Sequence, residues 1–181
     1  MTRVALVGLG RWGTNLLRAL DDLCDIVYCC NKGDYNAHSW IKHRYPHIKC
    51  TFDYQEILAD SNVEAVVIAT PIDTHGTLVR LALDSGKHVF VEKPLATSSE
   101  EAASLVEKAS KLSLTLFVGH LFLFHPVLGK IKDKTMSDPV SHVRMHWAKF
   151  GTFKENIFWN LVSHDVSLAL SLFQRNVCKA Y

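Results

Sequence analysis

The feature that most constrains this chain is a glycine turn that follows an apolar run near the start of the sequence. Val4-Ala5-Leu6-Val7 leads into Gly8-x-Gly10-x-x-Gly13, and an amphipathic stretch begins at once. This order predicts a buried strand, a tight turn and the start of a helix. Gly8 permits the sharp turn, Gly10 leaves room for a pyrophosphate, and Gly13 allows close packing of helix and strand. The free N–H groups and positive dipole of the helix N-terminus favour an anion there.

Glycines with this spacing also occur in turns that have only a structural role, so the position of the turn matters. Here a strand precedes it and a helix follows, as the binding of a dinucleotide requires. Arg11 and Trp12 lie between the glycines. We expect them to belong to the cofactor-binding loop with Gly8, Gly10 and Gly13.

Strand and helix patterns alternate over the first 118 residues. Apolar runs typical of buried strands recur at 26–30, 65–69, 88–91 and 114–118, with a weaker one at 47–52. The alternation predicts an α/β domain over residues 1–118, a Rossmann-type doubly wound parallel sheet. Because ligands bind outside the carboxyl ends of such strands, the residues that follow the strands should share one edge. The candidate cofactor-binding residues beyond the glycine turn are Asn31, Lys32, Thr70, Pro71, His75, Glu92 and Lys93.

The residue at the end of the second strand bears on the choice of cofactor. An acidic residue there would hold the ribose hydroxyls of NAD, but this chain has Asn31 followed by Lys32. Asparagine can donate to a hydroxyl, and the lysine can neutralise a phosphate, so NADP is not disfavoured. A plain turn, Asn-Lys-Gly-Asp, explains the same residues. Both NAD and NADP stay open as the cofactor.

The pattern changes after residue 118. Residues 126–134 and 159–173 have helical spacing, and 140–148 alternate as a strand. These predict a small, incomplete second α/β domain over residues 119–181, in which the strand edge needs a partner. Either the chain is a shortened version of a longer protein, or another subunit completes the domain. We expect a substrate and oligomerisation role for it, in a homo-oligomer.

Composition excludes several classes of protein. The net charge of +2 is spread over interleaved signs, so we expect neither a nucleic-acid nor a membrane surface, and no apolar run approaches the ~20 residues of a membrane span. Because the first strand begins close to Met1, we expect no signal or transit peptide, and the five cysteines form no C-x-x-C pair. These features favour the cytoplasm. His43 and His47 are four residues apart, but Pro46 lies between them and should end any helix there. His142 and His146 share a face of the predicted strand without a third ligand of suitable spacing, so no metal is expected.

Three motifs occur here in the order typical of one known family. They are Gly8-x-Gly10-x-x-Gly13, Ala69-Thr70-Pro71 with His75, and Gly86-Lys87-His88-Val89-Phe90-Val91-Glu92-Lys93-Pro94. Over nearly all of residues 1–175 the chain resembles the glucose–fructose oxidoreductase, inositol dehydrogenase and rhizopine-catabolism oxidoreductase family. The Glu-Lys-Pro strand end is far more specific than the glycine turn. The resemblance implies an NAD(P)-dependent oxidoreductase that acts on sugar and cyclitol hydroxyls.

Within that family, residues 159–167 look like the corresponding stretch of dehydrogenases that act on nucleotide-linked sugars. Gly119-His120 and His125-Pro126 agree with that subgroup. The resemblance implies that Lys93 and His164 flank the hydroxyl being oxidised. We expect Asn160 to join them as a catalytic residue, and all three, with His120, to bind the sugar or nucleotide-sugar substrate. Many relatives carry Asp four residues before the histidine, where this chain has Asn160.

The chemistry of alcohol oxidation assigns the two basic residues different roles. A free histidine titrates near neutral pH, whereas a free lysine titrates far above it. We therefore expect His164 to act as the base, with Lys93 stabilising alkoxide charge or orienting the hydroxyl. The alternative is a non-catalytic dinucleotide-binding sensor or scaffold, because some family members are regulatory, and Asn160 and the short second domain fit such a role.

Overall fold

The computed structural model describes residues 1–33, 35–137, 142–146 and 158–173 of the 181-residue chain. The chain divides into two compact units, Met1–Gly119 and His120–Tyr181. Each is described by itself below.

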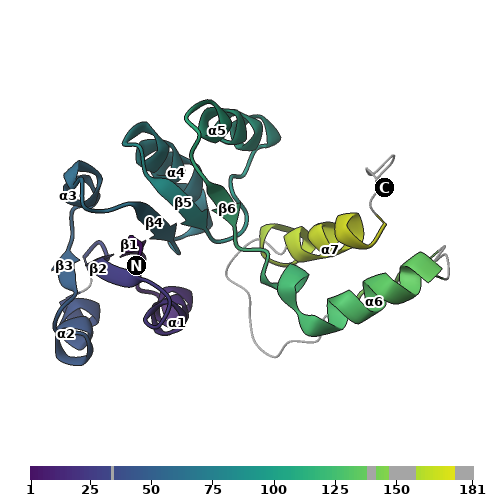
Figure 1. The fold of residues 1–181 in the computed structure, drawn as a ribbon, viewed down its shortest axis with the longest axis horizontal. Coiled ribbons are helices and arrows are strands. Elements are labelled where there is room, and N and C mark those ends of the chain that lie inside the picture. The colour runs from purple at the N-terminus through teal and green to yellow at the C-terminus, as the bar shows by residue number, and fades with distance from the viewer. Residues whose placement is uncertain (34, 138–141, 147–157, 174–181) are drawn as a thin grey trace. The chain divides into compact units, whose positions relative to one another are not determined.

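The first unit is built on a six-stranded parallel sheet (Figure 1). The strands lie side by side in the order β3-β2-β1-β4-β5-β6, so the direction of winding reverses between β1 and β4. This confirms the predicted doubly wound Rossmann-type sheet. The strands are β1 (Arg3–Val7), β2 (Asp25–Cys30), β3 (Lys49–Thr51), β4 (Ala65–Ile68), β5 (His88–Val91) and β6 (Leu116–Val118).

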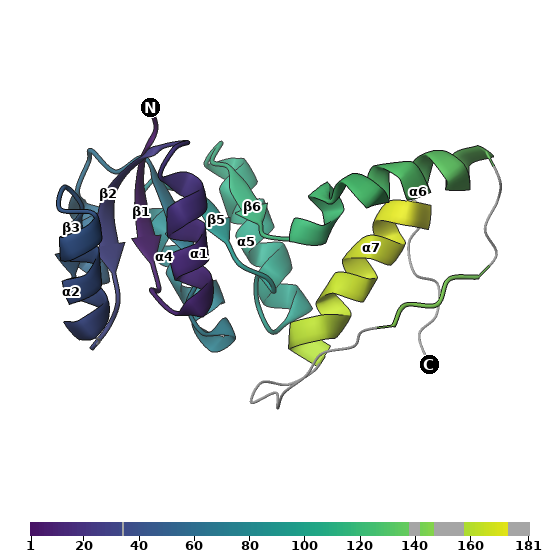
Figure 2. The same ribbon diagram turned by 90° about the horizontal axis from the view of Figure 1, so that it is seen from below.

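Helices cover both faces of this sheet, as Figures 1 and 2 show. On one face, α1 (Arg11–Leu20) and α2 (Tyr35–Arg44) bury Leu17 and Ile41 against the strands. On the other face lie α3 (Tyr54–Ala59), α4 (His75–Asp84) and α5 (Ser99–Lys111), with Leu83 and Leu105 in the core. Burial on both faces explains why the strands read as continuous apolar runs rather than as alternating ones.

Local sequence signals set the helix ends on the second face. The Asp53 side chain accepts a hydrogen bond from Gln55 N at 2.8 Å and begins α3. The Ser98 hydroxyl accepts one from Glu101 N at 3.1 Å and begins α5. Both are N-caps, which satisfy N–H groups that the first helical turn leaves without a partner. After α4, Gly86 takes a φ of +73°, a conformation that glycine adopts at little cost.

In the described residues of the second unit the regular structure is helical. A short turn η2 (Leu121–Phe124) precedes α6 (Pro126–Ser137), and a π-helical turn η3 (Phe158–Val162) leads into α7 (Ser163–Phe173). Helix α7 contacts both η2 and α6. The predicted strand over 140–148 is wrong for its described part, since 142–146 form no strand, and its remaining residues lie outside the described ones. Apolar and polar residues alternate in this segment, but its described backbone forms no hydrogen-bonded ladder with another strand.

The two-sided core makes a direct prediction for stability. Leu83 is fully buried at 0% exposure, whereas Leu23 is 72% exposed. We expect Leu83→Ala to lower the free energy of unfolding by about 2–5 kcal/mol, because a cavity replaces the lost side chain. Urea denaturation measures the change. Leu23→Ala is the control and should stay within about 0.5 kcal/mol of wild type; equal losses in both variants would contradict the described core.

Candidate functional site

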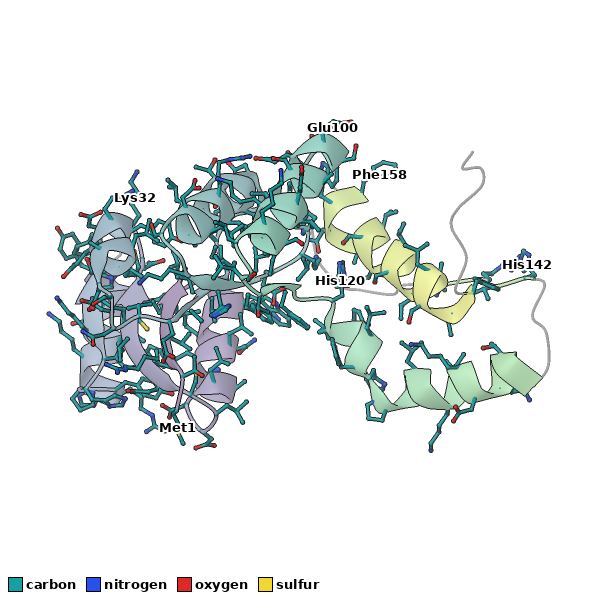
Figure 3. All side chains as sticks on the ribbon, turned by 45° about the horizontal axis from the view of Figure 1, so that its top comes forward. Met1, Lys32, Glu100, His120, His142 and Phe158 are labelled. Atoms are coloured by element: carbon teal, nitrogen blue, oxygen red, sulfur yellow. The ribbon has the colours of Figure 1, made fainter. Side chains whose placement is uncertain are left out.

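The register of the sheet brings the ends of its strands onto one line. Val7 pairs with both Cys30 and Ile68, and Ile68 pairs in turn with Val91. The ladder extends one residue further, because Gly8 N donates to Cys30 O at 2.8 Å and Glu92 N donates to Ile68 O at 2.9 Å. The residues that immediately follow the strands are therefore neighbours at the carboxyl edge. In Figure 3, Lys32 lies at this edge and Met1 at the opposite one.

The glycine turn packs closely against the loop after β4. Gly8 has a φ of +96°, and a Cβ on it would overlap the carbonyl group of Ala69. A Cβ on Gly13 would overlap the Gly8 carbonyl oxygen, so the start of α1 lies directly against the turn. A Cβ on Gly10, in contrast, would meet no atom within 4 Å. Two of the glycines are required for packing, and the third keeps a space open.

The open space at Gly10 suits an anion. Gly10 is the N-cap of α1, no side chain caps this helix end, and its first turn holds no acidic residue. The backbone N–H groups of the first turn are thus available to a ligand, with the positive end of the helix dipole behind them. A pyrophosphate fits this cradle. Arg11 and Trp12 of the same turn are exposed.

Asn31, at the end of β2, is tied to the glycine turn. Its Oδ1 accepts a hydrogen bond from Leu9 N at 3.0 Å. The oxygen is therefore occupied in holding the turn, and the donor Nδ2 remains for a ligand. Lys32 and Gly33 follow on the surface, with Gly33 at a φ of +80°. This end of the site offers a donor and a cation where NAD-binding units usually offer a carboxylate.

Hydrogen bonds made by two threonine side chains stabilise the loop after β4. Thr70 and Thr74 share a hydrogen bond between their hydroxyls at 2.7 Å, and Thr74 Oγ1 donates to Pro71 O at 2.7 Å. His75, the first residue of α4, is only 1% exposed, and its ring nitrogens lie 2.7 Å from Pro94 O and 2.9 Å from Thr70 O. The sequence predicts cofactor contact for His75. In the structure the ring joins the loop after β4 to the segment after β5.

Glu92 is the first residue after β5, and its side chain is 7% exposed. Burial raises the pKa of this carboxyl above its ordinary value of 4.5, while a hydrogen bond from the Trp12 side chain, one from Lys93 N and the charges of Lys93 and His75 oppose the rise. Oε2 makes no hydrogen bond in the described structure, and a Cβ on Gly119 would lie 3.1 Å from Oε1. The glutamate is thus a buried group behind the site, and Lys93 beside it is half-buried.

Two of these relationships were not visible in the sequence pattern. The contact of Trp12 with Glu92 links motifs that are 80 positions apart, and only the parallel register makes them neighbours. Gly119 lies against Glu92 because it follows β6 as Glu92 follows β5. Its position directly after an apolar run was the one signal that could have pointed to it.

The second unit holds the other predicted site residues. His164 lies in the first turn of α7, is 6% exposed, and meets the Phe122 ring edge-on with 4.7 Å between ring centroids. Asn160 lies one turn earlier in η3 and is half-buried. His120 precedes η2 and is labelled in Figure 3. Within this unit, Asn160 and His164 are therefore on successive turns of one helical segment.

A separate hollow of about 470 Å³ lies away from the carboxyl edge, where β4 and β5 begin. Lys87 lines it, but its buried Nζ donates to Asp60 O at 2.7 Å and to Val63 O at 2.8 Å. None of the predicted cofactor residues lines it, so it is not the candidate site. Among the described residues no group of three His, Cys, Asp or Glu side chains can hold a metal ion, and no described helix is long and apolar enough to cross a membrane.

Gly10 and Gly13 should respond differently to an added methyl group. Gly13→Ala places a Cβ on the Gly8 carbonyl, so we expect a loss of about 1–3 kcal/mol and a melting temperature lower by several degrees. Gly10→Ala is the matched control, since its φ of −67° suits alanine and the methyl meets open space. Thermal unfolding followed by circular dichroism compares them. A Gly13→Ala variant as stable as Gly10→Ala would contradict the close packing.

Glu92 should give the stability a specific pH dependence. Its carboxyl binds a proton more tightly in the folded chain than in the unfolded one. The stabilisation that proton binding gives to the folded state is therefore fully present below pH 4.5, and it is lost as the pH rises through the raised pKa of the folded state. We therefore expect Glu92→Gln to be more stable than wild type near neutral pH and to lose this advantage near pH ~4. Urea unfolding over a pH series measures this. Glu107, whose pKa is lowered by the hydrogen bond from Lys111, is the control: Glu107→Gln should show no gain at neutral pH.

Comparisons with known proteins agree with this geometry. The profile of the family described as "Oxidoreductase family, NAD-binding Rossmann fold" matches residues 2–120. Myo-inositol 2-dehydrogenase of Thermotoga maritima is 31% identical over 134 residues, which cover 72% of this chain and 40% of that protein. UDP-N-acetylglucosamine 3-dehydrogenase of Acidithiobacillus ferrooxidans is 30% identical over 114 residues, which cover 62% of this chain and 36% of that protein.

A solved structure shows the same fold. GenD2 from gentamicin A biosynthesis, in complex with NAD, has a TM-score of 0.81 at 24% identity, and the match covers 95% of this chain and 53% of that one. The chain spans about half the length, or less, of the curated relatives it matches. Since the family profile extends from the first strand to beyond the last, the chain belongs to the GFO/IDH/MocA family of oxidoreductases with an NAD-binding Rossmann fold.

Proposed function

We propose that the protein is an NAD(P)-dependent oxidoreductase that acts on a ring hydroxyl of a sugar or cyclitol, including nucleotide-linked sugars. The observation that carries the proposal is the meeting of the open glycine cradle with the Glu92–Lys93 strand end at one edge of the sheet. The names of the two relatives, a myo-inositol 2-dehydrogenase and a UDP-N-acetylglucosamine 3-dehydrogenase, support the substrate class.

The cofactor-binding roles follow from what each group offers. The first turn of α1, with Gly8, Gly10 and Gly13, would hold the pyrophosphate, and Arg11 lies in the same turn. Asn31 and Lys32 would hold the adenosine ribose, where a donor and a cation admit a 2′-phosphate. Thr70, Pro71 and Glu92 would shape the nicotinamide end. The nicotinamide, when bound, accepts or supplies a hydride.

The catalytic roles are assigned to two basic residues and one amide. Lys93 would orient the hydroxyl and stabilise its developing negative charge, and His164 would take the proton. Asn160, one turn before His164, and His120 would contact the sugar. The family resemblance supports these roles, as do the place of Lys93 at the strand edge and that of His164 in the first turn of α7.

An assay of binding and turnover tests the proposal. The full chain is titrated with NAD, NADH, NADP and NADPH, and reduced nicotinamide is then followed at 340 nm with inositols and UDP-sugars. We expect binding of at least one cofactor pair and turnover with one substrate class. Gly10→Asp, which puts a carboxylate into the cradle, is the control that should not bind. Binding without turnover on any hydroxyl substrate would favour the alternative, a non-catalytic sensor or scaffold.

Two lysines at the same edge make a matched pair of variants. Lys93→Met should lower kcat by about 10²-fold or more with a small change in cofactor Kd, because it removes a group that acts on the reacting hydroxyl. Lys32→Met should raise the Kd for NADP and leave kcat at saturating cofactor unchanged. Stopped-flow binding and steady-state kinetics separate the effects. Near-normal turnover of Lys93→Met would remove this residue from the catalytic site.

We also propose that the protein works in the cytoplasm as a homo-oligomer. The free thiols of Cys24, Cys29, Cys30 and Cys50 suit a reducing compartment. Apolar side chains on α6 and α7 are exposed in the single chain and support association: Val127, Ile131, Val166, Leu170 and Phe173. Light scattering at several protein concentrations tests the oligomeric state, and a monomer at all of them would contradict it.

A further inference from the structure

The most unusual contact at the carboxyl edge is made by a buried imidazole. His75 begins α4, and one ring nitrogen, Nδ1, lies 2.7 Å from the carbonyl oxygen of Pro94. The other, Nε2, lies 2.9 Å from the carbonyl oxygen of Thr70. The ring is 1% exposed, so water does not compete for either contact.

Both partners of this ring are acceptors only. A carbonyl oxygen cannot donate a hydrogen bond, and a neutral imidazole carries one N–H and one bare nitrogen. In the neutral form, one of the two contacts would therefore bring two lone pairs together within 3 Å in a buried place, at the cost of an unsatisfied acceptor. The imidazolium form donates to both carbonyl oxygens.

We propose that His75 is a positioning residue that, as an imidazolium, clamps the Thr70 and Pro94 carbonyls together and thereby fixes Lys93, the residue before Pro94. The clamp joins the loop after β4 to the segment after β5. It holds the two strand ends that flank the nicotinamide end of the proposed site. Its link to catalysis rests on the proposed function.

Neighbouring charges are compatible with a buried cation. One counter-charge is the buried carboxylate of Glu92, whose ionised form the charge of His75 favours. Lys93 lies beside Glu92 and opposes the cation, while Asp73 precedes His75 in η1 (Ile72–Thr74). From α5, Glu101 reaches Gly76, the residue after His75, and pairs with Arg80 of α4 at 3.5 Å. Acidic groups thus face the start of α4 from two elements.

Nitrogen-15 NMR of the histidine rings in the full chain tests the protonation state directly. We expect both ring nitrogens of His75 to carry a proton at neutral pH, because each of them faces a carbonyl oxygen. The spectrum requires neither cofactor nor activity. A bare nitrogen on His75 at neutral pH would overturn the clamp as stated.

A variant pair tests the positioning role. His75→Gln has one donor nitrogen in place of two, so it can bind one carbonyl and faces the other with its own oxygen. We expect kcat to fall about tenfold or more, which is the loss of one charge-assisted hydrogen bond, with a smaller change in cofactor Kd. His43→Gln, at an exposed site on α2, is the control.

The outcomes separate the two proposals. If His75→Gln and His43→Gln have equal kcat values, the positioning role is wrong, whatever the NMR result. The folded fraction of His75→Gln is measured in parallel. If its loss accounts fully for the fall in kcat and for the rise in cofactor Kd, the role of His75 is structural only and the proposal fails. If wild-type protein binds no nicotinamide cofactor, the proposed function fails, and the NMR result still decides whether His75 is the cationic clamp.

Discussion

The whole carboxyl edge depends on the hydrogen bonds of the parallel ladder. Parallel pairing in one register stops β1, β2, β4, β5 and β6 at the same level, and the bonds from Gly8, Ala69, Glu92 and Gly119 carry the ladder one residue further. Residues that are up to 111 positions apart in the chain are thereby held side by side. A slip of one residue in any strand would turn its side chains to the other face and separate the motifs.

The contacts that join the loops at this edge are made to main-chain atoms. The Gly8 turn lies on the Ala69 carbonyl, the Leu9 N–H is bound by Asn31, and the ring of His75 spans the carbonyls of Thr70 and Pro94. These contacts fix the backbone, while Gly10 and the first turn of α1 stay open. Because these contacts form within the chain itself, they should lower the conformational entropy that is lost when a ligand binds.

The sequence predicted the sheet, its helices and the shared edge because buried parallel strands and glycine turns leave strong local signals. It could not predict the orientation of single side chains. Cofactor contact of His75 stays a prediction, whereas its burial between two carbonyl oxygens could not be foreseen, because main-chain oxygens carry no sequence signal. Likewise, the strand predicted over 140–148 relied on alternation alone, without a neighbouring strand to pair with its described residues.

Asn31 has a consequence for anyone who wishes to change the cofactor preference of this protein. In the proposed function this side chain contacts the adenosine ribose, and in the structure it also ties β2 to the glycine turn through Leu9 N. A substitution of Asn31 therefore affects both the cofactor selectivity and the geometry of the glycine turn. Replacement by alanine or serine would loosen the turn while altering recognition, whereas aspartate keeps an acceptor for Leu9 and replaces the Nδ2 donor with a negatively charged oxygen. Redesign at this residue has one conservative route, and it leads toward NAD.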